Sequence, residues 1–234
     1  EEYTARMADR KDVIIFDTVK TIGDPTGNSV MFAGVYSNMG TIHINAENIN
    51  GLICLQIPDV EITIGSNVRR IERSSCFIQD NVAGGTSLVF EEGVQYINPM
   101  AFIIPTLENA LVLPDSLIEA SGPIFPGGFV VPSITIGGGL TTVPDNFFAA
   151  CRTSEVIVRE GVEVIGDNAF GQNNIGTKVT LPSTLLQIKN SAFMNWTNGV
   201  ELIIPSAEVI GNNAFFYWGN DLGSVSDQGV LVGE

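Results

Sequence analysis

Short segments in which apolar residues alternate with other residues recur along the chain at a nearly constant interval. Seven of them are triplets with an apolar residue at each end, at positions 62–64, 88–90, 111–113, 134–136, 156–158, 179–181 and 202–204. The last residues of successive triplets lie 26, 23, 23, 22, 23 and 23 positions apart. Because period-two alternation is typical of a strand with one buried face, each triplet predicts a short β-strand. Residues 41–44 and 230–232 predict two further strands.

A phenylalanine recurs with the same rhythm between the predicted strands. The residues that keep this interval are Phe77, Phe102, Phe125, Phe148, Phe170, Phe193 and Phe215. Their separations are 25, 23, 23, 22, 23 and 22 residues. A unit of about 23 residues is too small to enclose a core of its own, so such units must stack and bury a continuous apolar column. We therefore predict a solenoid in which these aromatic rings share one buried column.

Short polar residues precede the phenylalanines at a fixed distance. The residue three positions earlier is Asp145, Asp167, Asn190 or Asn212 in four successive units. Such side chains can accept a hydrogen bond from the first backbone N–H groups of a helix, so each one predicts the cap of a one-turn helix. The resulting fold class is an α/β solenoid, with one strand and one short turn or one-turn helix in each unit.

The rhythm divides the chain into three parts. Residues 1–40 keep apolar alternation at 13–16 but lack the recurring phenylalanine, which predicts an irregular N-terminal cap or first coil. Residues 41–218 form the predicted solenoid, and residues 219–234 form a C-terminal turn and terminal strand. An uncovered edge strand is a template for pairing, so Val230-Leu231-Val232 is a candidate for self-association with another subunit.

Two stretches carry a more specific signature. Residues 162–170 read Val-Glu-Val-Ile-Gly-Asp-Asn-Ala-Phe, and residues 179–193 contain a strand, a proline and a further Ala-Phe. Between Glu61 and Trp218 the chain resembles the BspA-type class of leucine-rich repeats. The resemblance implies a right-handed coil with a concave parallel sheet and short turns or one-turn helices on the convex side. It also implies an extracellular or cell-surface protein used for adhesion or for contact with other proteins.

The charge balance narrows the possible partners. The chain has 11 Lys and Arg residues against 26 Asp and Glu residues, which gives a formal net charge of −15. A nucleic-acid-binding protein needs cationic side chains to neutralise phosphates, so this class is not expected. The chain also lacks an apolar run of about 20 residues, so we expect no membrane insertion by this chain.

The middle residue of each predicted strand should face solvent, because strand side chains alternate. The resulting row of exposed residues is His43, Thr63, Val89, Val112, Thr135, Ile157, Thr180 and Ile203, with Glu155 and Glu201 on its margin. An apolar centre with a charged rim suits a binding face for a protein or possible glycan ligand. Alternatively, the row only stabilises neighbouring strands through cross-strand packing and binds nothing.

Tryptophans occupy one further repeated position. Trp196 and Trp218 each lie three residues after a phenylalanine of the column, where Cys151 stands in another unit. They are either core residues or, with Tyr217, an exposed platform for stacking on sugars. Cys54, Cys76 and Cys151 have no spacing typical of a disulfide or a zinc site, so we expect buried structural thiols.

No catalytic motif accompanies the single histidine, His43. The sequence has no nucleophile elbow, HExxH segment, phosphate-binding loop or dinucleotide fingerprint. We therefore expect no enzyme activity, no catalytic residues, no metal and no cofactor. Two functions remain: a surface or secreted binding protein that uses the exposed face of the sheet, or a structural spacer or assembly element of a cell surface or virion that self-associates through its terminal edge strand.

Overall fold

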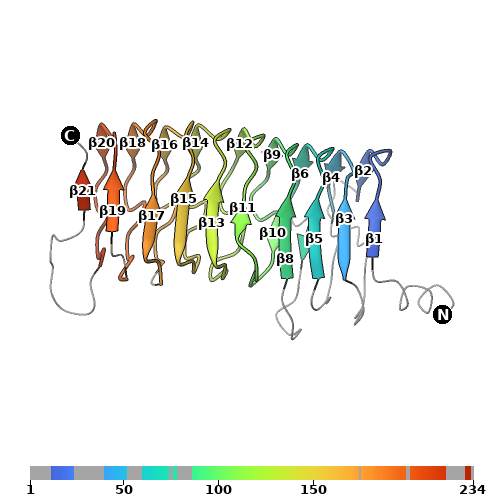
Figure 1. The fold of residues 1–234 in the computed structure, drawn as a ribbon, viewed down its shortest axis with the longest axis horizontal. Helices are drawn as coiled ribbons and strands as arrows, with labels where there is room; N and C mark the ends of the chain where they lie inside the picture. The colour runs from blue at the N-terminus through green and yellow to red at the C-terminus, as the bar shows by residue number, and fades with distance from the viewer. Residues whose placement is uncertain are drawn as a thin grey trace.

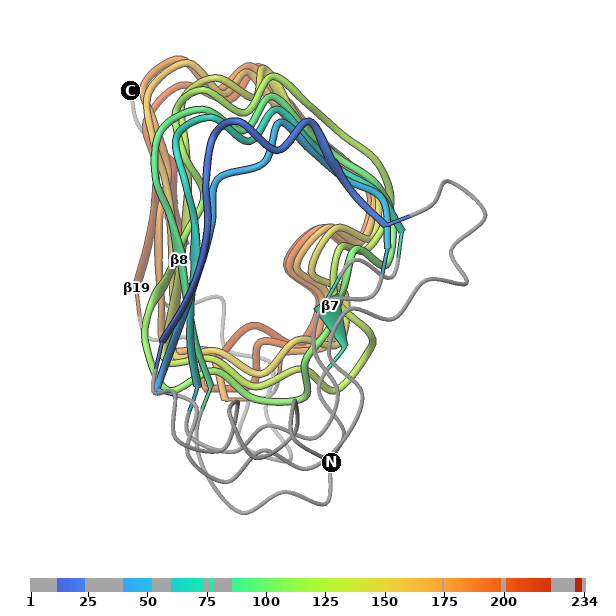
Figure 2. The same ribbon diagram turned by 90° about the vertical axis from the view of Figure 1, so that its right-hand side faces the viewer.

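The structure is a computed structural model that describes residues 12–23, 40–51, 60–73, 76–77, 86–173, 175–198, 201–219 and 230–232. The chain winds into coils that stack along one axis (Figure 1). Principal strands point upward on the near side, the chain passes over the top to the far side, and successive coils add toward the left. Seen end on, the coils superpose around a common interior (Figure 2), and the winding is right-handed.

Two parallel sheets form the principal wall of the solenoid, and they confirm the predicted strands. The N-terminal sheet has the order β1 (Asp12–Ile15), β3 (Thr41–Ile44), β5 (Val60–Ile64) and β8 (Thr86–Phe90). The C-terminal sheet has the order β11 (Leu111–Val112), β13 (Ser133–Ile136), β15 (Glu155–Val158), β17 (Lys178–Thr180), β19 (Glu201–Ile204) and β21 (Val230–Val232). Each pair is parallel, and equivalent residues of the triplets stand opposite each other, for example Val156 and Val179.

A second wall of two-residue strands corrects the prediction of one strand per repeat. Its two sheets have the orders β12 (Glu119–Ala120), β9 (Tyr96–Ile97), β6 (Arg70–Ile71), β4 (Asn48–Ile49), β2 (Thr21–Ile22), and β14 (Thr142–Val143), β16 (Val164–Ile165), β18 (Gln187–Ile188), β20 (Val209–Ile210). A third pair joins β7 (Cys76–Phe77) to β10 (Phe102–Ile103). Alternation is not visible over two residues, so these strands could not be predicted from it, although one residue of most of them, such as Ile165, is buried.

The segments around the phenylalanines are short turns, which was one of the two predicted alternatives. The described residues contain no helix, so the one-turn helices and the α/β class are not confirmed. The residues two before and two after Phe170, Asn168 and Gln172, have φ values of 53° and 65°. The same two positions are left-handed around Phe148, Phe193 and Phe215. A left-handed residue interrupts a right-handed helix, so the segment turns twice instead of winding.

These turns bond to the next coil as well as within themselves, where for example the N–H of Gly171 donates to the carbonyl of Asn168 over 3.2 Å. The N–H groups of Asn168, Phe170 and Gln172 donate to carbonyl oxygens of the following coil over 2.9, 2.8 and 2.6 Å. The carboxylate of Asp167 accepts from the N–H of Asn190 over 2.8 Å, and Asn190 accepts in turn from the N–H of Asn212. The polar residues predicted as helix caps therefore cap the equivalent residue of the next coil.

The predicted column of aromatic rings is confirmed between Phe102 and Phe215. Phe170 stacks on Phe148 at 5.9 Å and on Phe193 at 5.3 Å between ring centroids. The column continues through Phe102, Phe125 and Phe215. All six rings are buried except that of Phe215, which is partly covered. The side chain of Phe77 lies outside the described residues.

The tryptophans belong to the core, and a sugar-stacking platform at these two residues is therefore wrong. Trp196 is fully buried and Trp218 is 6% exposed, and their rings stack at 5.4 Å. The indole N–H of Trp196 donates to the carbonyl of Phe170 over 2.7 Å. A Cβ at Gly176 would lie 2.3 Å from the Trp196 ring, so only glycine fits beside it.

One of the three predicted thiols can be placed. Cys151 occupies the position equivalent to the tryptophans and is 3% exposed. Burial disfavours the thiolate and raises the pKa of Cys151 to about 12, so this thiol is a small core residue. Cys54 and the side chain of Cys76 lie outside the described residues.

The principal wall is interrupted between β8 and β11. The two strands belong to different sheets, and the side chain of Asn109 lies between them. Its amide oxygen accepts from the N–H of Leu88 over 3.0 Å, and its amide nitrogen donates to the carbonyl of Leu88 over 2.9 Å. A side-chain amide therefore supplies the two bonds that a neighbouring strand would provide, and it joins the halves of the wall.

Candidate functional site

We call the solvent side of the principal wall the principal face. Because the strands are in register, one side chain from each strand forms a continuous row across it. The predicted members are His43, Thr63, Val89, Val112, Thr135, Ile157, Thr180 and Ile203. All eight residues lie at equivalent register positions, interrupted only at the junction between β8 and β11.

Exposure along the row is uneven. Val89 and Val112 are each 40% exposed and Ile203 is 52% exposed, and Thr180 is also exposed. His43, Thr63, Thr135 and Ile157 are half-buried. Among the eight predicted residues, the exposed apolar side chains are therefore at the junction and near the C-terminal end of the row.

The sequence did not predict two residues at the ends of the row. Ile14 stands opposite His43 and is 59% exposed, and Leu231 stands opposite Ile203. Apolar alternation at residues 13–16 was the available signal for the first of these residues. This alternation alone did not predict a strand of the regular solenoid, because the recurring phenylalanine is absent from residues 1–40.

Charged residues line the face where the strands begin. Glu155 is half-buried, and its carboxylate accepts from the ammonium group of Lys178 on the next strand over 2.7 Å. Glu201 stands opposite Lys178 in the register, but its side chain lies outside the described residues. The two predicted margin residues thus flank one lysine.

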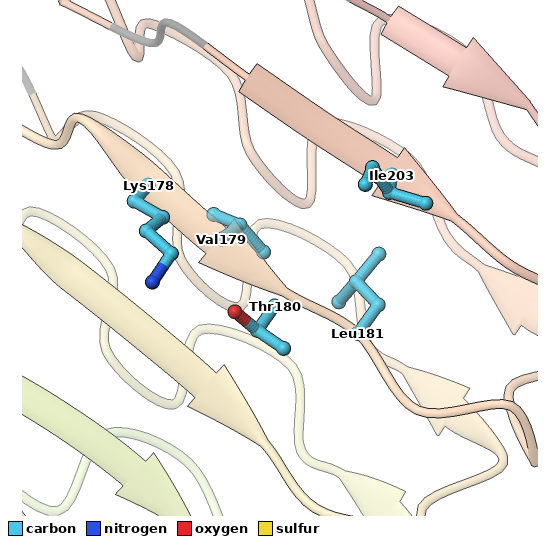
Figure 3. A pocket seen from close by; sticks show the side chains of 5 residues that line it. All are labelled: Lys178, Val179, Thr180, Leu181 and Ile203. Atoms are coloured by element: carbon cyan, nitrogen blue, oxygen red, sulfur yellow. The ribbon is translucent and has the colours of Figure 1, made fainter.

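A hollow of about 250 Å³ opens on the face between β17 and β19 (Figure 3). It is lined by Lys178, Val179, Thr180, Leu181 and Ile203. Strand β17 ends at Thr180, and Pro182 has no N–H with which to continue the ladder, whereas β19 extends to Ile204. The side chain of Ile203, which is 52% exposed, therefore lies beside the end of its neighbouring strand, where Thr180 is exposed and Val179 and Leu181 are buried. We call this the apolar hollow.

A second and wider hollow of about 770 Å³ adjoins the first. It shares Thr180 and Leu181 with the apolar hollow and is otherwise lined by Asp115, Gly138, Gly139, Val158, Arg159, Glu160 and Pro182. The guanidinium of Arg159 donates to the carboxylate of Asp115 over 3.1 Å. We call this the charged hollow; sequence reasoning did not single out Asp115 or Glu160, which come together from coils 45 residues apart in the chain.

Both carboxylates of the charged hollow are held in the ionised form. The N–H of Gly138, together with Arg159, lowers the pKa of Asp115 below its usual 3.8. Hydrogen bonds from the backbone and hydroxyl of Ser183 and from Thr184 lower the pKa of Glu160 below its usual 4.5. The hollow therefore keeps two negative charges and one positive charge at neutral pH.

Two further features concern the described residues as a group: a metal site and a membrane-spanning helix. Within them, no three His, Cys, Asp or Glu side chains lie close enough together to hold a metal ion. The same part of the chain has no helical segment with the length and apolar character that a membrane crossing requires.

The fold and the face together define a class: a right-handed parallel β-solenoid of repeats of about 23 residues with one broad exposed sheet. The family comparison makes the class specific. Six copies of the BspA type leucine rich repeat region match residues 95–221, which is more than half of the chain. The chain therefore belongs to the BspA-type leucine-rich repeat family.

Solved structures with a similar course of the chain come from two proteins. A leucine rich cell surface protein from Faecalibacterium prausnitzii A2-165 is 13% identical, with a TM-score of 0.38, and the match covers 88% of this chain and 70% of that chain. The pneumococcal vaccine antigen PcpA is 17% identical, with a TM-score of 0.35, over 87% of this chain and 69% of that chain. No curated protein matches the chain.

Proposed function

We propose that this protein is a non-enzymatic, secreted or surface-displayed binding protein whose principal face contacts another protein. The observation that carries the proposal is the apolar surface of Val89, Val112 and Ile203, which lie in one row across the two sheets of the principal wall. Apolar side chains exposed on a regular face and bordered by charged groups suit the centre and rim of an interface. Membership of the BspA-type family, with the surface location that the resemblance implies, supports the same reading.

The proposal is tested with two matched variants of one coil. Ile203 on the principal face and Val209 on the second wall are each 52% exposed, so Ile203→Asp and Val209→Asp make the same change on different surfaces. Binding of each protein to immobilised fibronectin, laminin, fibrinogen and type I collagen is measured by surface plasmon resonance. We expect at least one of these proteins to bind, with Ile203→Asp weakening the affinity at least tenfold and Val209→Asp leaving it unchanged.

Equal losses in both variants, or binding that neither variant changes, would place any interface elsewhere and refute the proposal. Circular dichroism of both variants serves as the control, because an aspartate at an exposed position should leave the fold intact. Absence of binding to all four proteins would contradict the expected result and count against the proposal.

One observation favours the second candidate function, an assembly element. β21 is the last strand in the order of its sheet, so among the described residues one of its edges has no neighbour. Such an edge can pair with a strand of a second copy. Deletion of residues 230–234 should then convert an oligomer to a monomer in size exclusion with light scattering. A wild-type protein that is monomeric at 100 µM, roughly the concentration at which weak strand pairing would be detected, would rule this function out.

A further inference from the structure

The apolar hollow has the size and lining of a site for one side chain. Three of its five residues, Val179, Leu181 and Ile203, are aliphatic. Its volume of about 250 Å³ exceeds the roughly 150 Å³ of an apolar cavity that accepts benzene. A leucine, isoleucine, methionine or phenylalanine side chain of a partner can therefore enter it, and interfaces concentrate their binding energy at such anchor positions.

The charged hollow begins where the apolar hollow ends, because Thr180 and Leu181 line both. A group bound beside the anchor side chain would face Asp115 and Glu160. Arg159 compensates Asp115 over 3.1 Å, whereas the contacts of Glu160 are to the backbone and hydroxyl groups of Ser183 and Thr184. Each carboxylate has lone pairs beyond those contacts, so the position favours a cation.

Both borders of the principal face carry mostly negative charge. Where the strands begin, Asp12 and Glu61 are exposed and Glu155 is half-buried, against the single cation of Lys178 in the described part of that border. Where the strands end, the carboxylates are Asp17, Glu91, Glu92, Asp115 and Glu160, against Arg159 and Arg69, whose guanidinium contacts the carbonyls of Ser66 and Gly93. With a chain charge of −15, this distribution attracts a basic surface and repels an acidic one.

We infer that the partner of the principal face is a basic protein segment in which a large apolar side chain lies next to a lysine or arginine. The apolar side chain enters the hollow beside Ile203, and the cation lies over Glu160 in the charged hollow. This inference rests on the proposed function, because it names the kind of protein that the face binds. A glycan is disfavoured, since no aromatic ring is among the described residues that line either hollow.

A random 12-residue peptide library displayed on phage serves as the probe, because it samples many combinations of charged and apolar side chains. The library is panned on the immobilised protein at low salt, and bound phage are eluted and sequenced. We expect enrichment of peptides that have Lys or Arg within two positions of Leu, Ile, Met or Phe. The best peptide is then synthesised, and its affinity is measured by fluorescence anisotropy.

Four measurements with that peptide test the geometry. Ile203→Asp should weaken binding at least tenfold, and Glu160→Gln, which removes the charge but keeps an acceptor oxygen, should weaken it about threefold to tenfold. Val209→Asp is the matched control and should bind like the wild type. Raising the salt concentration should weaken wild-type binding more than binding to Glu160→Gln, because one screened attraction is already missing in the variant.

The outcomes separate this inference from the proposed function. Enriched peptides that depend on Ile203 but are acidic or uncharged would overturn the inference and leave the principal face as a binding surface. Peptides that bind Ile203→Asp as tightly as the wild type would overturn the inference and count against the principal face as a binding surface. A panning experiment without any enriched sequence would also overturn the inference, while the matrix-protein measurements decide the proposed function independently.

Discussion

The coils before the junction at Asn109 and the coils after it are built differently. Both regions have a principal wall and a second wall of short strands. The column of stacked phenylalanines begins with Phe102 just before the junction, but only later coils, those of Phe148, Phe170, Phe193 and Phe215, have a left-handed residue on each side of the ring. The described residues before Met100 include no left-handed residue other than glycine. The family match covers the later region, residues 95–221.

The difference shows that two independent devices hold this solenoid together. Strand pairing requires only apolar residues at alternating positions, and it therefore extends through both regions. The aromatic turns require Phe and a residue two positions before it that adopts positive φ, such as Asn146 and Asn168, so they occur only where both are present. In the later coils these turns add a repeated third column of bonds between coils, whereas the described residues before the junction have only the β7–β10 pair in its place. We therefore expect the later coils to resist unfolding by urea more strongly.

The largest expected effect comes from removing one ring of the column. Phe170→Ala should lower the free energy of unfolding by about 3–5 kcal/mol, because it deletes a buried ring stacked on both sides. Phe90→Ala, at the edge of the earlier region, should cost less, since this ring is only partly buried and meets one neighbouring ring, Phe102, in the described residues. Urea unfolding followed by circular dichroism gives both values. Equal costs would mean that the column does not distinguish the two regions.

The junction itself should show a smaller effect. Asn109→Ala removes both hydrogen bonds to Leu88 and leaves a partly buried N–H and carbonyl without a partner. We expect a loss of about 1–3 kcal/mol, and hydrogen exchange should increase most at Leu88. The exposed neighbour Glu108 provides a control, because Glu108→Ala should stay within about 0.5 kcal/mol of wild type. A variant as stable as wild type would show that the bonds of Asn109 are not needed to join the two regions, which the pairing of β9 with β12 also connects.

The smallest effect concerns a carboxylate that joins two of the later coils. The pKa of Glu160 is lowered in the folded protein by bonds to Ser183 and Thr184, so its stabilising effect is present above the usual value of 4.5 and is lost as the pH falls through the lowered value. Glu160→Gln should therefore melt below wild type at pH 7, and the difference should shrink as the pH falls below 4.5. Melting temperatures between pH 7 and pH 3 check this. A difference that grows on acidification would contradict the assignment.

Part of the candidate site could be predicted from the sequence because alternation is a local property. The triplet at residues 179–181 indicates which side chain faces solvent, and Thr180 and Ile203 do stand side by side in the register. The hollow between them was not predictable, because it depends on how far two strands extend relative to each other. Likewise, Asp115 and Glu160 come together only through stacking.

The sequence by itself determined the repeat, the principal strands and the buried phenylalanine column, since period and burial follow from the order of apolar residues along the chain. Only the tertiary structure decided the conformation of the turns. Asp167 could cap a helix in its own unit, but the next coil offers its N–H groups, and the segment around Phe170 adopts the left-handed residues that align donors with those carbonyls. Partners about 22 residues away are invisible to a local pattern, and their hydrogen bonds outweigh its preference for a helix.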